Sequence, residues 1–390
     1  MSESETFRAE VRHWLEANCP PSMRTPIRTA DGMVSGGSRM SFHSEDQRLW
    51  FERMRDRGWF APGWPRAYGG GGLSPGEQRI LEQEMRTLGC RPPQYNLGIW
   101  MLGPVLLEFG SEEQKARHLL PMARGEVRWC QGFSEPNAGS DLASLRTSAV
   151  RDGDDFIVTG QKIWTSHGDH ADWMYALVRT DPTTRKQQGI SFLLIDMKSR
   201  GVTVRPIELI SGKSEFCEVF FDDVRVPAQN VVGGIGQGWG VAKRLLEHER
   251  SAMAKFSEGA APSLDSLAIA APYLDGAEPV WRDRLAAALM DQQAFVLTVR
   301  RLQEMAQTRE DMSGLGSIMK LVQTEQESAK YELLQQLMGQ RGLGLQEDMY
   351  TPDERAVRHL WLYTKSYTIA GGASEIQLNI IARRVLGLPT

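Results

Sequence analysis

The period of the hydrophobic pattern changes twice along this chain of 390 residues, and no other feature constrains the fold as much. Residues 1–128 carry apolar side chains at helical spacing, residues 129–232 carry short β-branched runs, and residues 233–390 return to helical spacing. No helix-length pattern lies between the β-branched runs. The sequence therefore predicts an α+β multidomain protein with an N-terminal helical domain, a central antiparallel β-barrel or sandwich, and a C-terminal helical bundle.

The individual elements follow from the same pattern and from local start and stop signals. Helices are predicted over 44–59, 74–89, 103–110, 111–125, 237–259, 280–307, 317–339 and 374–387. Strands are predicted over 155–164, 173–180, 189–197, 201–209 and 218–227. Segments 20–42 and 60–72 have the composition of loops.

Composition and charge narrow the class of protein. The 45 basic and 49 acidic residues give a net charge of −4, which argues against a protein that grips nucleic-acid phosphates. No stretch approaches the ~20 apolar residues of a membrane span, and the polar N-terminus lacks the order of a secretory signal. The four cysteines, which form no CxxC motif, are predicted to be isolated thiols in a reducing compartment. These features predict a cytoplasmic protein.

Glu249 is the first residue that points to chemistry. It lies in the middle of an apolar helix face formed by Ala242, Leu245, Ala252 and neighbouring positions. A carboxylate at such a position must be paired or must have a raised pKa. A raised pKa suits a general base that removes a weakly acidic proton near neutral pH. At this point the alternative is a structural ion pair with the C-terminal helices.

Two segments of the central domain have the composition of ligand-binding loops. Segment Ser134–Leu145 combines hydroxyl side chains with Gly139, which lets the backbone approach a ligand closely. Trp164 follows downstream and is flanked by two hydroxyl residues. An ordinary turn and a packed tryptophan are the alternatives.

A third segment precedes the last predicted helix. Ser374 is predicted to be the N-cap of that helix, with Gln377 at the capping-box position. Gly371 and Gly372 allow a backbone nest that suits an anion or an oxyanion. The chain contains no HxxxH motif, no Walker-type sequence and no GxGxxG after a strand, so a metal site and a Rossmann nucleotide site are unsupported.

Six blocks in order resemble the acyl-CoA dehydrogenase family. They are WFAPGWPRAYGG, GPVLLEFGSEEQKARHLLPMARGE, WCQGFSEPNAGSDLASL, GQKIWTSHGDHADW, EVFFDDVRVP and GGASEIQLNIIARRVLGLP. The resemblance covers nearly the whole chain. It implies FAD as cofactor, an acyl-CoA substrate and an N-terminal helical, central β and C-terminal four-helix architecture.

The resemblance also implies roles for individual residues. Ser134 and Ser166 match hydroxyl residues that hydrogen-bond the flavin, and Trp164 matches the aromatic residue stacked on it. Ser140 and Arg250 match contacts to coenzyme A. The remaining positions that match FAD contacts are Gln131, Phe133, Gln336, Gly339 with Gly342 beyond it, Ala373 and Glu375.

The catalytic base follows from comparing two branches of the family. Many members carry a glutamate at the position that is Gly371 here, whereas the isovaleryl-CoA dehydrogenase branch carries the base on a helix before an arginine. That second position is Glu249, followed by Arg250. The resemblance implies that Glu249 removes the substrate α-proton and that the Gly371 N–H polarises the thioester carbonyl. Replacing Gly371 by alanine is expected to be tolerated if φ there is negative.

Partners also follow from the resemblance, together with two departures from the family pattern. The implied electron acceptor is an electron-transferring flavoprotein, and a homotetramer or homodimer is expected, with a heteromer as the alternative. An Arg-x-x-Phe-Gly stretch that contacts FAD in many members is missing, and Ala373 replaces the usual threonine. Two other functions stay open: a flavin oxidase or monooxygenase of the same fold, and a silent partner subunit.

Overall fold

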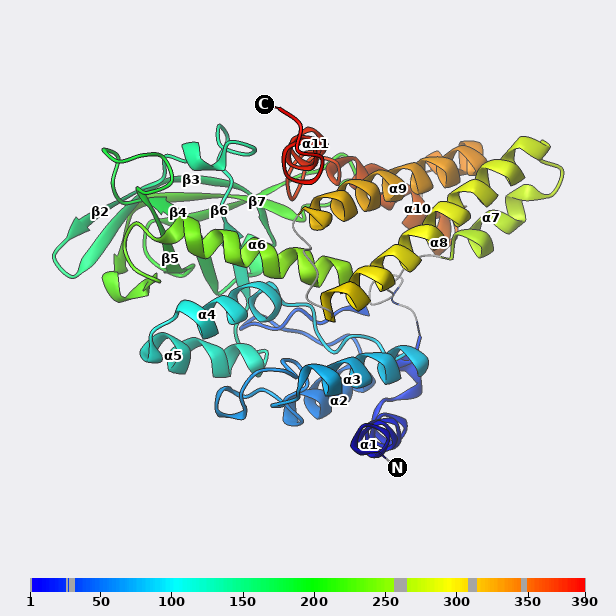
Figure 1. Cartoon of the computed structure of the whole chain (residues 1–390), viewed down its shortest axis with the longest axis horizontal. Helices are drawn as coiled ribbons and strands as arrows, with labels where there is room; N and C mark the ends of the chain where they lie inside the picture. Colours follow the sequence, from blue (N-terminus) through cyan, green and yellow to red (C-terminus); the bar gives the residue numbers. More distant parts are fainter. Residues whose placement is uncertain are drawn as a thin grey trace. The chain divides into compact units, whose positions relative to one another are not determined.

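The computed structural model describes residues 2–25, 27, 32–255, 265–307, 314–344 and 349–389, with side chains left out at 250–255, 303 and 306–307. The chain divides into two compact units, Met1–Ala252 and Met253–Thr390 (Figure 1). Within the described ranges, every helix is too short or too polar to span a lipid bilayer.

The first unit begins with five helices. They are α1 (Glu3–Asn18), α2 (Glu45–Asp56), α3 (Pro75–Thr87), α4 (Gly103–Phe109) and α5 (Glu112–Ala123). Serines at positions 44, 74 and 111 accept hydrogen bonds from the first turns of α2, α3 and α5, which confirms these predicted starts. A π-helical turn, Gly98–Leu102, leads into α4. α1 was not predicted, although Ser2 and Glu5 form a capping box at its start.

Eight strands form a sheet in the order β6-β7-β3-β2-β4-β5-β8, with β1 beside β4. They are β1 (Trp129–Gly132), β2 (Ser148–Asp152), β3 (Asp155–Ser166), β4 (Trp173–Arg179), β5 (Ile190–Asp196), β6 (Val202–Ile207), β7 (Phe216–Pro227) and β8 (Val231–Val232). The five predicted strands are confirmed. Most neighbouring strands pair antiparallel, as predicted, but β1 and β2 both pair with β4 in parallel.

Strand β4 is buried on both faces, and its alternating side chains join two hydrophobic cores. Tyr175 and Leu177 pack with the helices of the first unit, whereas Met174, Ala176 and Val178 pack with side chains of β3, β5 and β7. Helix α6 (Gly238–Lys255) adds Val241, Ala242 and Leu245 to the helical core.

The second unit is a helical bundle. Its helices are α7 (Ser266–Leu274), α8 (Pro279–Gln307), α9 (Leu315–Met338), α10 (Pro352–Tyr363) and α11 (Ser374–Ile380). Helix α9 contacts α7, α8, α10 and α11, and α8, α9 and α10 run side by side in Figure 1. Tyr331, Leu334 and Val357 form the centre of its core. α7 and α10 were not predicted.

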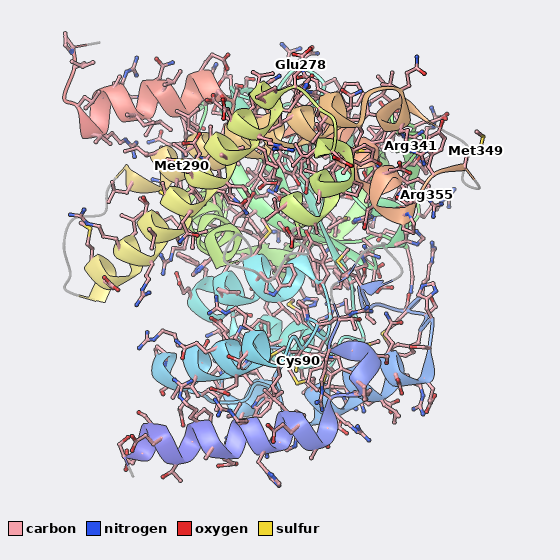
Figure 2. All side chains as sticks on the ribbon, turned by 90° about the vertical axis from the view of Figure 1, so that its right-hand side faces the viewer. Cys90, Glu278, Met290, Arg341, Met349 and Arg355 are labelled. Carbon is pink, nitrogen blue, oxygen red and sulfur yellow. The ribbon has the colours of Figure 1, made fainter. Side chains whose placement is uncertain are left out.

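The cysteines are free thiols, but two of them are not isolated as predicted. The thiols of Cys19, at the end of α1, and Cys90, after α3, hydrogen-bond each other. This hydrogen bond and the nearby Arg24 lower the pKa of Cys19. Cys90 is labelled in Figure 2, beside the N-terminal helices.

Candidate active site

The segment that begins in β1 carries four of the predicted residues. Gln131 lies within β1, in register with Tyr175 of β4. Phe133 is buried, with its ring edge-on to Tyr175 at a centroid distance of 6.0 Å. The Ser134 carbonyl accepts a hydrogen bond of 2.9 Å from a β3 backbone N–H. Ser140 is exposed beyond a tight turn, so the loop is anchored at its start and open at its end.

Trp164 interrupts β3 at a bulge. The pairing of β3 with β7 shifts register between Lys162 and Thr165, and Trp164 has a φ of +59°. A positive φ is unusual for a bulky residue, and such strain concentrates at functional sites. The indole is 56% exposed, with Phe216 edge-on at 6.2 Å. Trp164 is therefore not a core tryptophan of its unit.

The side chains around this bulge fit a flavin ring. An isoalloxazine needs a flat apolar contact and polar contacts along its edge, and the exposed Trp164 indole offers the first. Within the described ranges, the hydroxyls of Ser134 and Ser166 have no hydrogen-bond partner. The same holds for the buried Oγ1 of Thr165. The Ser134 and Ser166 hydroxyls, which belong to partly exposed residues, are available to a bound ring.

Helix α6 carries Glu249, and the part of its apolar face that precedes Glu249 is described, whereas Ala252 and the positions after it lie outside the described side chains. Val241, Ala242 and Leu245 are 2% exposed or less, and Glu249 follows one turn after Leu245, partly buried. The polar face of the same helix is solvated. The side chain of Arg250, the predicted contact to coenzyme A, lies outside the described residues.

Two tyrosines that were not predicted lie within range of the Glu249 charge. Burial raises the pKa values of Tyr95 and Tyr175, and the negative charge of Glu249 raises both further. Tyr95 also lines a cavity of about 10 Å³ together with Ser166. The fold thus brings Glu249, Gln131, Phe133 and Ser166 around the same two tyrosines. The sequence signal for Tyr175 is a polar hydroxyl within the apolar run of β4, and it was overlooked.

The Gly371 loop of the second unit is held by two side chains. Lys320 of α9 donates to the carbonyls of Tyr367 at 3.1 Å and Gly372 at 2.7 Å, and burial lowers its pKa. Gln377 donates to the carbonyls of Gly371 and Gly372, both at 3.3 Å. The carbonyls are therefore engaged, while the Gly371 N–H has no backbone acceptor within the described ranges.

The predicted cap of the last helix was wrong. Ala373 is the N-cap of α11, and no side chain caps the helix. The Ser374 hydroxyl is buried, with no partner in the described part of the chain. The capping box fails because Gln377 donates back to the glycine loop. Glu375 is exposed in the first turn.

The negative φ that would let Gly371→Ala be tolerated is not found, because φ at Gly371 is +65°. We expect Gly371→Ala to destabilise the loop by roughly 1–2 kcal/mol through left-handed backbone strain. The new Cβ would meet no clash, because its nearest neighbour is Lys320 Cε at 3.9 Å, so the backbone is the cause of the loss. Gly371→Asn is the matched variant, since asparagine tolerates this conformation. Thermal unfolding should show a larger loss for alanine; equal losses would contradict a backbone cause.

The predicted adenine-binding segment follows the C-terminal end of α9. Gln336 accepts a hydrogen bond of 3.1 Å from Arg284 of α8, and Gly339 has a φ of +56° where the helix ends. Arg341, in the turn Gly339–Leu343, forms an ion pair with Glu354 of α10; Figure 2 labels it. Gln336 lies about 24 Å along α9 from Lys320, the residue that holds the Gly371 loop.

Comparison with known families covers almost the whole chain. The N-terminal, middle and C-terminal domain models of acyl-CoA dehydrogenase match residues 1–126, 130–224 and 236–386. Among the described residues, no group of three or more His, Cys, Asp or Glu side chains is arranged to hold a metal ion.

Curated relatives and solved structures agree with these matches. Acyl-CoA dehydrogenase IpdE1 of Mycobacterium tuberculosis is 36% identical over 100% of this chain and 99% of its own length. Acyl-CoA dehydrogenase FadE34 of the same organism is 40% identical over 86% of this chain, but the match spans only 45% of FadE34. The solved structure "Tcur3481-Tcur3483 steroid ACAD" superimposes with a TM-score of 0.79 and 29% identity, covering 99% of this chain and 97% of that one.

Proposed function

The chain belongs to the acyl-CoA dehydrogenase family, and from this premise we propose that it converts an acyl-CoA thioester to the 2-enoyl-CoA with Glu249 as the base. The observation that carries the assignment is a partly buried carboxylate that follows Val241, Ala242 and Leu245 on the apolar face of α6, with its charge felt by Tyr95 and Tyr175. Position 371, where many members carry the base, is a glycine.

In the proposed reaction, Glu249 takes the α-proton of the thioester, and the electron pair left behind forms the double bond. Apolar neighbours on α6 keep water away from the reacting groups. The Gly371 N–H donates to the thioester carbonyl and stabilises the charge that develops there. Bound FAD would accept the hydride that leaves the β-carbon, and an electron-transferring flavoprotein would then reoxidise the cofactor.

The other predicted residues bind cofactor and substrate in this proposal. Trp164 provides the flat contact to the flavin, and Ser134 and Ser166 provide donors at its edge. Ser140 and Arg250 contact coenzyme A. The remaining contacts to FAD are assigned to Gln131, Phe133, Gln336, Gly339, Ala373 and Glu375.

We further propose that the active enzyme is a heteromer with a second chain of the same family. The Arg-x-x-Phe-Gly stretch is missing here, and Arg284, which lies against Gln336, is engaged within its own unit. The solved steroid ACAD combines Tcur3481 with Tcur3483, and another solved structure is a complex of ChsE4 with ChsE5 from Mycobacterium tuberculosis. The name of the Tcur3481-Tcur3483 structure also favours a bulky, steroid-linked acyl group as the substrate.

We expect the purified chain to bind FAD weakly alone and in stoichiometric amounts when co-expressed with its partner. Flavin absorbance after gel filtration measures the FAD occupancy of the chain alone. The same measurement is made after co-expression with each further acyl-CoA dehydrogenase chain of the source organism. A panel of straight, branched and steroid-linked acyl-CoA thioesters, with an artificial electron acceptor, then tests turnover. Full FAD occupancy and activity of the chain alone would contradict the heteromer. Rapid oxygen consumption without an acceptor would favour an oxidase.

A further inference from the structure

A buried ion pair lies beneath the segment that carries Ser134. Lys162 of β3 is fully buried, and its Nζ donates to Glu135 Oε1 at 2.8 Å and to the Phe133 carbonyl at 3.2 Å. Glu135 is 8% exposed and also accepts hydrogen bonds from the N–H groups of Arg146 at 2.6 Å and Thr147 at 2.9 Å. Every charge of the pair is thus matched by a polar partner.

The ion state of this pair follows from its surroundings. Burial lowers the pKa of Lys162 to about 8, and the Glu135 carboxylate opposes that shift. Burial alone would raise the pKa of Glu135, but Lys162 and the N–H donors outweigh it and lower the pKa. Both groups are therefore charged at pH 7.

Stability alone is a weak reason for such a pair. Replacing both members of a buried ion pair by apolar side chains of similar volume is often neutral or stabilising. On the inward side of β3, the earlier residues are apolar. Phe156 and Val158 lie on this side and are 2% and 0% exposed. Lys162 lies four residues after Val158 on the same side of β3, and a lysine at such a position is the sequence signal that was overlooked.

The geometry of one peptide group links the pair to the candidate flavin contact. The Phe133 carbonyl and the Ser134 N–H belong to the same planar trans peptide, so they point in opposite directions. Lys162 holds the carbonyl, which turns the N–H away from the ion pair. The next carbonyl, that of Ser134, is held by the Ile163 N–H at 2.9 Å. Both peptides that flank Ser134 are therefore fixed by β3.

Ser134 keeps its own donors available. Within the described ranges, its N–H has no backbone acceptor and its hydroxyl has no partner. An ammonium on the carbonyl of a peptide polarises that peptide and makes its N–H a stronger donor. The buried charge thus acts on a peptide whose N–H has no backbone acceptor within the described ranges.

We propose that Lys162 and Glu135 are a positioning pair, which orients and polarises the Phe133–Ser134 peptide so that its N–H donates to the flavin ring. The inference rests on the proposed function, since it requires FAD at Ser134. The pair touches neither substrate nor cofactor and acts through the peptide alone.

The test compares the wild-type chain with two variants. Glu135→Gln with Lys162→Met removes both charges and keeps an acceptor for the Arg146 and Thr147 N–H groups. Glu135→Gln alone keeps the contact of Lys162 with the Phe133 carbonyl but leaves the buried ammonium without its counter-ion. The matched control is Lys186→Met, because Lys186 pairs with Asp141 at the same 2.8 Å but is 60% exposed.

We expect the double variant to bind FAD about tenfold more weakly, with shifted visible absorption bands of the flavin. Glu135→Gln is expected to lie between the double variant and the wild type. In the chain without FAD, amide hydrogen exchange of peptides covering residues 131–137 should be faster in the double variant. Lys186→Met should match the wild type in all three measurements.

Two outcomes separate this inference from the proposed function. Wild-type FAD affinity, flavin spectrum and amide exchange in the folded variants would overturn the positioning role and leave the function standing. A lower melting temperature with unchanged FAD affinity and spectrum would also overturn it. Failure of the wild type to bind FAD, alone or with a partner chain, would count against the function, and the exchange measurement would still report on the peptide.

Discussion

Glu249→Gln is expected to bind FAD and acyl-CoA and to lose a factor of about 10² or more in turnover. Removing a general base typically lowers the rate by 10²–10⁴, and glutamine has nearly the same volume as glutamate, so packing on α6 is preserved. Steady-state turnover with an artificial electron acceptor measures the loss, and flavin absorbance confirms that the cofactor is bound. Activity within threefold of the wild type would remove Glu249 from the base position.

A neighbouring carboxylate provides the control for this variant. Glu247 lies on the exposed side of α6 and pairs with Arg244 at 2.8 Å, so Glu247→Gln should keep wild-type turnover. A substrate analogue with sulfur in place of the β-carbon can lose the α-proton but no hydride. Exchange of its α-proton with deuterated water should be lost in Glu249→Gln and kept in Glu247→Gln. Such a result separates proton removal from redox chemistry.

The fold was predicted where its causes are local. The starts of α2, α3 and α5 depend on a serine and the next three residues, and the long strands β3 and β7 depend on alternation within one segment. Strands β1, β2 and β8 were missed because they are short, with four, five and two residues. The parallel pairing of β1 with β4 joins segments that are far apart in the sequence, such as Trp129 and Trp173, and no local pattern encodes it. The contact between Cys19 and Cys90 has the same origin.

The candidate site divides in the same way. Glu249 could be singled out because helical periodicity alone places it among Val241, Ala242 and Leu245. Tyr95 and Lys162 matter through partners on other elements, which only the tertiary structure brings close. The positive φ of Gly371 also depends on distant residues, since Lys320 and Gln377 hold the carbonyls of its loop. Local motifs therefore indicate the reacting groups, and packing decides what supports them.

His118 is expected to make the first unit sensitive to acid. It lies on α5, 5% exposed, and packs edge-on against the rings of Trp129 at 5.2 Å and Trp173 at 4.9 Å. Burial, with a smaller contribution from the charge of Arg117, lowers its pKa from 6.5 to about 4. As the pH falls below 6.5, the unfolded chain takes up a proton at this ring and the folded chain does not. The free energy of unfolding therefore falls by about 1.4 kcal/mol per pH unit, or about 3 kcal/mol by pH 4.

His118→Phe should remove this dependence, because a phenyl ring fits against the two indoles and has no proton to gain. Urea denaturation followed by tryptophan fluorescence at pH 7 and pH 4.5 gives the loss of stability for each chain. The loss should be about 2–3 kcal/mol smaller in the variant than in the wild type, since the carboxylates that titrate in this range are common to both and cancel. His170→Gln is the control, as this ring is 55% exposed and its replacement should leave the difference unchanged. An equal acid loss in His118→Phe and the wild type would mean that the His118 ring is already protonated against the two tryptophans.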